Sequence, residues 1–475
     1  MIFSSSIFLF AFMPLFFACY YLVRQKWKNV VILLGSALFY AWGAPKFIFV
    51  IIGTTLLDFF LVQKMDATKT EWHRKILLVF SVCINLGLLI YFKYSNFFIE
   101  NVNVLLAGIG FNQIHWTKLI LPIGISFYTF ETMTYVVDVY RRVHKPLKNF
   151  WEYQLYIILF PKLIAGPIIR FHELADQIND RRSTTTIDHV LTGFYRFVLG
   201  LAKKVIIANT MGMYADQIYG LDAATVSTLT AWLAALAYTM QIYFDFSGYS
   251  DMAIGLGKMM GFTFPENFNN PYTSQNITEF WRRWHITLGA WMRNYLYIPL
   301  GGNKVSSTGR LYFNLWLFFL ASGLWHGASW SFIFWGCYHG LFLVLERAGL
   351  SKFYNNIGRI PSMIITFVIV LTGWVVFRIE DFGVAAVFLK KMYAFNFNAP
   401  LQFPVFDFWS TLLVAIIFSF FVLPVKGQKL QHRIFFGNYT VKRHLFMTCV
   451  SAILLFISAT AILGSSFNPF IYFRF

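Results

Sequence analysis

Long apolar runs, separated by short polar segments, recur from one end of the chain to the other. A helix needs ~20 mostly apolar residues to cross a bilayer. Clear examples of such runs are residues 7–23, 47–62, 76–91, 119–139, 311–345, 363–376 and 445–463. The strands of a membrane barrel would instead show short-period alternation with frequent turns. The pattern predicts an all-α, polytopic membrane protein with about ten to twelve transmembrane helices.

The composition agrees with a membrane protein. The 475 residues are 58% hydrophobic and 13% charged, against about 45–50% apolar and about 25% charged in soluble domains. The cysteines are Cys19, Cys83, Cys337 and Cys449, without a CxxC pair or metal-ligand spacing. We therefore expect neither a disulfide framework nor a metal site.

The net charge of +18 is distributed unevenly among the loops. Basic residues gather in alternate loops, at Arg24, Lys26 and Lys28, at Lys64, Lys69, Arg74 and Lys75, and at Arg141, Arg142, Lys145 and Lys148. Residues 95–116 have no lysine or arginine. This pattern places the basic loops in the cytoplasm and the N-terminus outside. Anionic lipids are then the expected partner of the charge, and nucleic acid is not, although a polyanionic cytosolic substrate stays open.

The second half of the chain is less regular than the first. Pro161, the Gly166-Pro167 pair, Gly248, Gly255 and residues 265–271 interrupt its apolar runs. Irregular backbone at membrane depth survives only where protein or water satisfies it, which predicts re-entrant or half-membrane segments around 160–175 and 245–302. We expect one membrane-embedded domain, 1–475, with regular helices in 1–150, an irregular core in 151–346 and C-terminal helices in 347–475.

The polar stretch WRRWHITLGAWMRNYLYIPLGG, residues 281–302, stands out in this apolar chain. Asn276 and Glu279 have the spacing of an N-cap and its N3 partner. The helix that follows is expected to carry on one face Trp281, Trp284, His285, Leu288 and Trp291, with Arg282, Arg283 and Arg293 pointing elsewhere. An interfacial helix with arginines on lipid phosphates is the simpler interpretation.

Two histidines interrupt ASGLWHGASWSFIFWGCYHGLF, residues 321–342. His326 and His339 lie in an almost charge-free run, where ionisable groups usually face a bundle interior or a watery cavity. A buried histidine is expected to stay neutral, which is the state that a general base needs. Small residues around His326 leave room for a substrate or for close helix packing. A hydrogen-bonded structural role stays open for each histidine.

Acidic residues break the run YFDFSGYSDMAIGLG, residues 243–257, where Gly248 is expected to allow a helix break. Asp245 and Asp251 are expected to pair with arginines, hold a cation or cap broken helix ends. Lys162 and Arg170 lie beside the Gly166-Pro167 pair, and for them too a structural ion pair or a helix cap is the simpler alternative to a functional role.

Five blocks of the chain together resemble the membrane-bound O-acyltransferase family, in its bacterial, alginate O-acetyltransferase-like branch. They are MIFSSSIFLFAFMPLFFACYYLV, FPKLIAGPIIRF, QIYFDFSGYSDMAIGLGKMMGF, FNNPYTSQNITEFWRRWHITLGAWMRNYLYIPLGGN and GLWHGASWSFIFWGCYHG. The resemblance covers most of the chain, and the last two blocks, in this order, are specific together.

The resemblance implies an enzyme of the bacterial inner membrane that moves an acyl group from a thioester to a hydroxyl, inside a tunnel. It places the key histidine at His326, and a second functional histidine at His285. Other members often have an asparagine at the second position, so no asparagine role is carried over. The implied donor is acetyl-CoA or a related cytosolic carrier, a substrate and not a bound cofactor. The implied receiver is an extracytoplasmic partner protein that O-acetylates a polysaccharide.

From the residue pattern and the family resemblance together, we expect neutral His326 to act as the base. We expect His285 to bind or polarise the reacting group. Arg282, Arg283, Arg293 and Lys304 are the expected contacts of the donor phosphates, while Asp245, Asp251 and His339 are expected to be tunnel-lining or structural. A secondary transporter with a midplane site, a scaffold, and transfer of D-alanyl or another acyl group to a cell-wall polymer are the alternatives.

Overall fold

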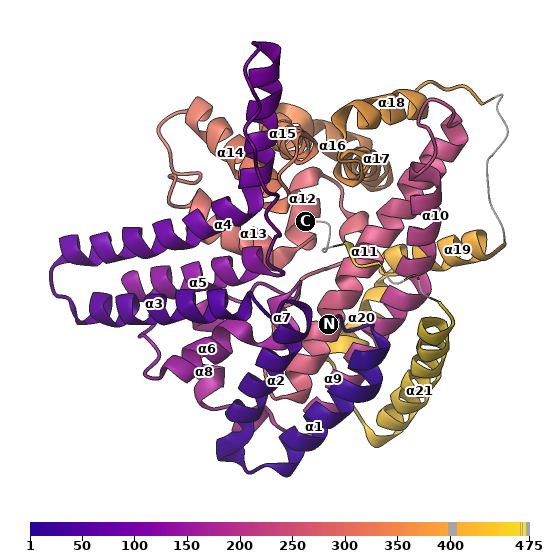
Figure 1. Ribbon diagram of the computed structural model, residues 1–475. Coiled ribbons are helices and arrows are strands. Elements are labelled where there is room, and N and C mark those ends of the chain that lie inside the picture. Colours follow the sequence, from indigo (N-terminus) through magenta and orange to yellow (C-terminus); the bar gives the residue numbers. More distant parts are fainter. Residues whose placement is uncertain (398–405, 466, 468, 472–475) are drawn as a thin grey trace. The chain divides into compact units, whose positions relative to one another are not determined.

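The apolar runs fold into helices in a computed structural model that describes residues 1–397, 406–465, 467 and 469–471. Figure 1 shows helices joined by turns and loops, with no strand in that part of the chain. The all-α prediction is confirmed. The contacts divide the chain into unit 1, Met1–Ile2 with Ile7–Thr184, and unit 2, Phe3–Ser6 with Thr185–Phe475. The expectation of a single domain stays a prediction.

Unit 1 is built from regular helices followed by shorter ones. Its α-helices are α1 (Met13–Leu22), α2 (Lys28–Gly43), α3 (Ile48–Ala67), α4 (Glu71–Gly108), α5 (Ile125–Tyr140), α6 (Phe150–Ile158), α7 (Phe160–Leu163) and α8 (Phe171–Asn179). Helix α7 lies in the region where the sequence predicted interrupted structure. There Lys162 is fully buried and paired with Glu131 of α5, and Arg170 pairs with Glu173, so both cations have structural partners.

Two of the basic loops of unit 1 meet at one end. Arg142 binds Glu71 across 2.7 Å, which joins the α5–α6 loop to the start of α4. Gln63 Nε2 donates to the carbonyl of Leu147 at 2.7 Å, which joins the end of α3 to the same loop. The two loops therefore lie at the same end of unit 1, and their assignment to the cytoplasmic side stays a prediction.

Unit 2 holds every candidate catalytic residue. Its α-helices are α9 (Ile187–Ala202), α10 (Asn209–Tyr219), α11 (Thr228–Met259), α12 (Ile277–Arg283), α13 (Ile286–Met292), α14 (Thr308–His326), α15 (Trp330–Leu345), α16 (Ser351–Ile357), α17 (Arg359–Arg378), α18 (Phe382–Met392), α19 (Phe406–Phe420), α20 (Val425–Phe436) and α21 (Val441–Gly464). A π-helical segment, η4 (Lys203–Ala208), joins α9 to α10. The apolar run 311–345 forms two helices, α14 and α15, which lie side by side (Figure 1).

The glycines of α11 serve helix packing, and the predicted break at Gly248 is wrong. Helix α11 runs without interruption through Gly248 and Gly255. A Cβ on Gly248 would lie 2.7 Å from the carbonyl oxygen of Gly200, and one on Gly255 would lie 2.5 Å from that of Gly193. Small residues at matching positions let the two backbones approach closely, so these glycines hold α9 against α11.

The described helices include four that are long and apolar enough to cross a membrane, namely α3, α4, α17 and α21. Helices α19 and α20 form a fifth candidate, bent by 89° at a short break that matches a broken span or a re-entrant loop. The polytopic prediction is confirmed. Interrupted structure was expected over 245–302, and it begins only after α11 ends at Met259.

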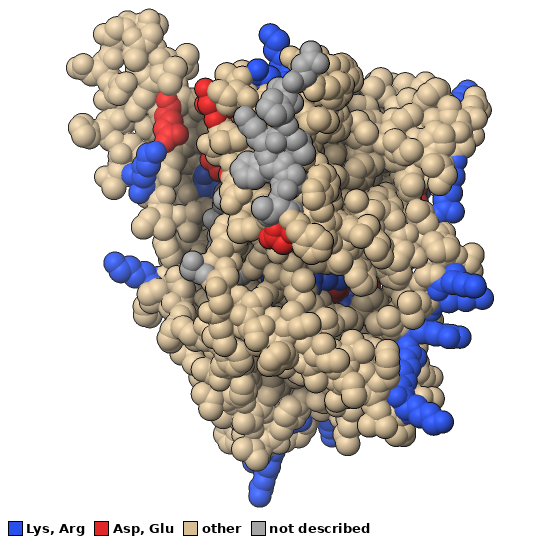
Figure 2. Space-filling model, turned by 90° about the vertical axis from the view of Figure 1, so that its right-hand side faces the viewer, with Lys and Arg blue, Asp and Glu red and all other residues tan. Residues whose placement is uncertain are grey.

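The surface fits a membrane environment. Figure 2 shows a face dominated by uncharged side chains, with lysine and arginine projecting at a few places and few acidic groups. Exposed large apolar side chains are frequent on the candidate spans, for example Phe49, Phe80, Ile364 and Phe456. Such exposure is unfavourable in water and expected against lipid tails.

Candidate active site

His285 lies at a sharp break between two short helices. Helix α12 ends at Arg283 and α13 begins at Ile286, while His285 has a left-handed backbone with φ of 46°. The single helix predicted through this stretch is therefore wrong. An extended segment takes the hydrogen bonds that a continuous helix would make: Asn269 N donates to Arg283 O, and Ile286 N donates to Asn267 O, both at 2.9 Å.

Asn267 fixes the ring of His285. Its Oδ1 accepts from the backbone N–H of Thr287 at 3.2 Å and from the Thr287 hydroxyl at 3.0 Å, and it lies 3.1 Å from His285 Nδ1. Its Nδ2 donates to Ser250 Oγ at 3.0 Å. A backbone N–H can only donate, so the shared atom is an oxygen and His285 Nδ1 must carry a proton.

The other nitrogen of His285 is left as an acceptor. A neutral ring with its proton on Nδ1 has a lone pair on Nε2. His285 is 2% exposed, and no residue in the described part of the chain forms a hydrogen bond with its Nε2. A buried acceptor of this kind is unusual in a folded protein and needs an explanation.

The start of α12 is held by two side chains. The predicted N-cap is confirmed, because Asn276 Oδ1 accepts from the backbone N–H of Glu279 at 2.7 Å. The carboxylate of Glu346, which is 4% exposed, accepts from Ile277 N at 2.6 Å and Thr278 N at 3.0 Å. A carboxylate at a helix N-terminus satisfies free N–H groups and complements the helix dipole.

His326 is the last residue of α14, and glycines hold its neighbourhood together. A Cβ on Gly323 would lie 2.3 Å from the Phe332 carbonyl oxygen, and one on Gly327 would lie 2.1 Å from the Phe332 ring. Of the two uses suggested for these small residues, the glycines serve close packing. The His326 ring is 5.2 Å from the Trp335 ring and 5.1 Å from the Phe377 ring, both edge-on.

One cavity brings His285 and His326 together. It has a volume of about 50 Å³ and is lined by Trp281, Trp284, His285, Leu288, Gly289, Met292, Phe318, Phe319, Ser322 and His326. The remaining lining is mainly aromatic and aliphatic, with Ser322 supplying a hydroxyl. Two imidazoles in an apolar cavity provide proton-accepting groups where water is scarce, which suits general base chemistry.

His339 lies behind this cavity and does not line it. Its ring packs edge-on against Trp281 at 4.9 Å and against Trp335 at 5.0 Å. It is fully buried, and no described residue forms a hydrogen bond with either of its nitrogens. The Trp335 ring contacts the rings of both His339 and His326.

Both aspartates of α11 form ion pairs within the protein. Asp245 binds Lys204 at 2.9 Å and accepts the backbone N–H of Ile471 at 2.9 Å. Asp251 binds Arg196 at 2.6 Å and Lys203 at 2.7 Å. Their partners therefore come from α9 and η4, and not from the arginines near His285.

The expected donor contacts differ in their availability. Arg282, Arg293 and Lys304 are exposed and make no ion pair within the part of the chain that the structure describes. Arg283 is half-buried and binds Glu279 at 2.7 Å. Three of the four cations are thus accessible to an anionic ligand, while Arg283 also stabilises α12.

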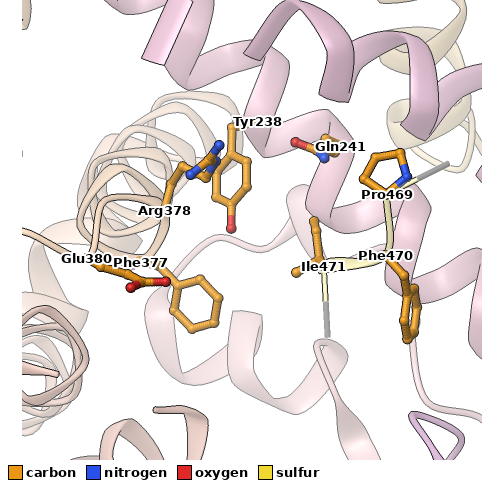
Figure 3. Close-up of a pocket in the computed structure, with 8 residues that line it drawn as sticks. All are labelled: Tyr238, Gln241, Phe377, Arg378, Glu380, Pro469, Phe470 and Ile471. Atoms are coloured by element: carbon orange, nitrogen blue, oxygen red, sulfur yellow. The ribbon is translucent and has the colours of Figure 1, made fainter. Parts of the chain in front are cut away.

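A second, smaller pocket (Figure 3) is lined in part by Phe377, whose ring packs edge-on against His326. It is lined from α11 by Tyr238 and Gln241, from the end of α17 by Phe377 and Arg378, and from the C-terminal segment by Pro469, Phe470 and Ile471. Lys204 donates to the carbonyl of Pro469. The Lys204–Asp245 pair therefore anchors the C-terminal segment against α11.

Several residues that build this site could not be recognised from the sequence alone. Asn267 was visible only as part of an asparagine-rich stretch before Pro271, and Glu346 only as the first acid after a long apolar run. Phe377 of α17 was indistinguishable from other apolar residues of a membrane helix. Their roles depend on contacts between segments far apart in the chain.

Comparisons with known proteins agree on the class of molecule. A sequence model of the membrane-bound O-acyltransferase family matches residues 146–368. The probable alginate O-acetylase AlgI of Pseudomonas putida is 41% identical over 492 residues, covering all of both chains. That of Pseudomonas aeruginosa is 46% identical over 398 residues, 83% of this chain and 75% of the other. The peptidoglycan O-acetyltransferase of Helicobacter pylori is 36% identical over 430 residues, 83% and 80% of the two chains.

Proposed function

Because this chain belongs to the membrane-bound O-acyltransferase family, we propose that it moves acetyl groups from a cytosolic thioester to hydroxyls for O-acetylation of an extracytoplasmic polysaccharide. It is an O-acyltransferase and a multi-pass membrane protein with bacterial relatives. The relatives are named for acetylating alginate or peptidoglycan, which favours acetyl as the group and a glycan polymer as the final acceptor.

The observation that carries the proposal is the cavity shared by His285 and His326. Acyl transfer from a thioester requires a base for the attacking hydroxyl and an oriented site with little water. Both imidazoles line one cavity, while His339, the other histidine of this region, does not. His285 and His326 are the histidines of unit 2 that line this cavity, which supports a catalytic role for both.

In the proposed reaction, His326 takes the proton of the acceptor hydroxyl as its oxygen attacks the thioester carbonyl. The carbon–sulfur bond then breaks, the oxygen ester forms, and His326 returns its proton to the leaving thiolate. General base catalysis of this kind contributes typically ~10² to 10⁴-fold. His326 begins and ends the cycle neutral.

His285 is proposed to bind, not to polarise, the reacting group. Its Nδ1 proton is committed to Asn267 Oδ1, so Nε2 accepts a hydrogen bond and has no proton to give to a carbonyl. It would hold another O–H or N–H of the bound substrate beside the reacting centre, because the single proton of the attacking hydroxyl goes to His326. Of the two roles that the sequence left open, the tautomer favours this one.

Trp281 is proposed to stabilise the developing oxyanion. Its indole lines the cavity, and no described residue accepts a hydrogen bond from its Nε1. Loss of one oxyanion donor typically costs ~10² to 10³-fold in kcat. Trp281→Phe keeps an aromatic ring while removing the N–H, so a kcat drop with an intact fold is expected, and an unchanged kcat would exclude this role.

The donor is proposed to enter beside Arg282, Arg293 and Lys304. These exposed cations could bind the phosphates of acetyl-CoA or a related carrier by charge-assisted hydrogen bonds, and Arg283 would add its charge from within the Glu279 pair. The basic-loop pattern supports a cytoplasmic donor side in the bacterial inner membrane. An extracytoplasmic partner protein would receive the acetyl group and modify the polysaccharide.

The test is release of free thiol from acetyl-CoA by the purified, full-length protein in detergent, with and without membrane extract that contains the outer partner. We expect thiol release that depends on protein and is accompanied by labelled acetyl on a polymer or partner. Thiol release from D-alanyl or longer acyl thioesters, but not from acetyl-CoA, would contradict the choice of donor. Uptake of a solute into vesicles without thiol release would contradict the enzyme.

A further inference from the structure

A third cavity lies outside the site described above. It has a volume of about 380 Å³ and lies between the start of α9, the end of α11 and the turn that joins α20 to α21. His189, Lys258 and Tyr439 are among the side chains that line it. None of its lining residues belongs to the His285–His326 cavity, so it needs an explanation of its own. We call it the α9–α20 pocket.

The pocket lies at the end of a candidate membrane span. Asn438 and Tyr439 line it, and α21 begins two residues later at Val441. His444 Nε2 lies 2.7 Å from Asp188 Oδ1, and Tyr195 OH lies 2.8 Å from Thr448 Oγ1, so α21 is fastened to α9 beside the pocket. The end of a span is where phospholipid headgroups lie.

The lining of the pocket carries two cations and two carboxylates, and the segment beside it is strongly basic. Residues 425–443, which form α20 and the turn into α21, contain five lysines and arginines and no acid. Helix α20 has no buried residue, and it is bent by 89° from α19. A largely exposed basic helix of this kind is typical of the cytoplasmic membrane surface, where anionic lipids gather.

Asp188 and Glu266 also line the pocket near Lys258. Asp188 faces His444 and Glu266 binds Arg196, so neither forms an ion pair with Lys258. Arg196 also lines the pocket, but its guanidinium binds Asp251 and Glu266, both at 2.6 Å. In the described parts of the chain no side chain forms an ion pair or hydrogen bond with Lys258, although it is only partly exposed. A half-buried ammonium without a directly bound anion favours a ligand that brings one.

The walls suit a ligand that is apolar beside its charge. Arg196 lies flat on the Phe435 ring, 4.0 Å from its centroid, and so ties α20 to α9. Leu199, Ile254, Phe262 and Phe264 supply the apolar lining deeper in the pocket. A free phosphate would leave these apolar walls uncovered, whereas the glycerol and upper acyl chain of a phospholipid would cover them.

We propose that the α9–α20 pocket binds the phosphate-bearing headgroup of an anionic phospholipid. The Lys258 ammonium donates to the phosphate oxygens, and the apolar walls hold the glycerol and the first carbons of an acyl chain. The lipid seals the junction of α9, α11, α20 and α21. This site is independent of acyl transfer and does not rest on the assignment of His285 or His326.

The test uses the full-length protein, exchanged into detergent and titrated with short-chain phosphatidylglycerol while bound lipid is counted by native mass spectrometry. The matched phosphatidylcholine is the neutral control. We expect one tightly retained phosphatidylglycerol in the wild type, and binding about fivefold weaker in Lys258→Gln, the effect of one cation near a lipid surface. Lys258→Arg should retain binding, and Lys390→Gln, an exposed lysine of α18, should match the wild type.

The outcomes separate the sources of the phosphate. Equal retention of phosphatidylglycerol by wild type and Lys258→Gln, with both folded, would overturn the proposal. Displacement of the lipid by millimolar inorganic phosphate or by coenzyme A would overturn it in favour of a free or nucleotide phosphate. Phe435→Ala removes the ring under Arg196 without changing charge, so unchanged lipid retention in that variant would also contradict the proposed walls.

Discussion

Replacing Asn267 with alanine tests how His285 is held. Asn267 Oδ1 accepts from the Thr287 backbone N–H, the Thr287 hydroxyl and His285 Nδ1, at 3.2, 3.0 and 3.1 Å. The alanine leaves all three donors without this acceptor inside the protein. A buried hydrogen bond contributes about 0.5–1.5 kcal/mol net, so we expect the free energy of unfolding to fall by about 2–4 kcal/mol.

The catalytic effect of this change should exceed the effect on stability. Without Asn267, the His285 ring loses both its orientation and the contact that keeps its proton on Nδ1. Misplacement of a reacting group by about 1 Å can cost ~10²-fold in rate, so kcat should fall about 10²-fold while the protein still folds. The assay is thiol release from acetyl-CoA beside thermal unfolding of the same preparations.

Ser250→Ala is the matched control for Asn267→Ala. It removes only the acceptor of Asn267 Nδ2, at 3.0 Å, and leaves the three contacts of Oδ1 in place. We expect a loss of about 1 kcal/mol of stability and a kcat close to that of the wild type. If Asn267→Ala kept its kcat within about threefold of wild type, the positioning of His285 by Asn267 would be refuted.

Further predictions concern the donor side, a buried ion pair and helix packing. Arg282→Ala should raise the apparent KM for the donor more than it lowers kcat, since the side chain is exposed; unchanged donor dependence in steady-state kinetics would remove the phosphate contact. Lys204→Met leaves Asp245 buried without its partner and should cost about 3–5 kcal/mol, measured by thermal unfolding, with partial recovery when Asp245→Leu is added. Gly200→Ala places a Cβ 2.5 Å from a carbonyl oxygen of α11 and should cost about 1–3 kcal/mol. Gly53→Ala, where the added Cβ meets nothing within 4 Å, should be neutral or stabilising.

Periodicity predicted the helical class but not the course of the chain around His285. Trp281, Trp284 and His285 have helical spacing, and the sequence therefore predicted one helix through them. The helix breaks because Asn267 and Asn269, more than a dozen residues earlier, take its hydrogen bonds. Local spacing carries no information about such distant acceptors, so tertiary contacts overrode it.

The break predicted at Gly248 was wrong for a different reason. From the sequence, Gly248 predicts a break in the helix, because glycine tolerates many backbone conformations. In the structure it faces Gly200 across two closely packed helices. A pairing of glycines spaced seven residues apart on both α9 and α11 was present in the sequence. Recognising it required knowing that these two helices are neighbours.

The sequence identified polar side chains of the candidate site better than it predicted how they are arranged. His285 and His326 were singled out as polar residues in apolar surroundings, and they line one cavity. His339 was singled out by the same reasoning and lies outside it, against Trp281. The resemblance to the family is confirmed by the matched relatives, whereas the roles of individual residues stay proposals that activity measurements must test.

The most direct test of the two-histidine site is acetyl transfer by purified His285→Ala, His326→Ala and His339→Leu variants, each shown to be folded, with labelled acetyl-CoA and the outer partner supplied. We expect the rate of acetyl transfer to fall by at least ~10²-fold in the first two variants. In His339→Leu it should stay near the wild-type rate. Transfer that survives in His326→Ala, or that collapses equally in all three, would contradict the assignment of the His285–His326 cavity as the active site.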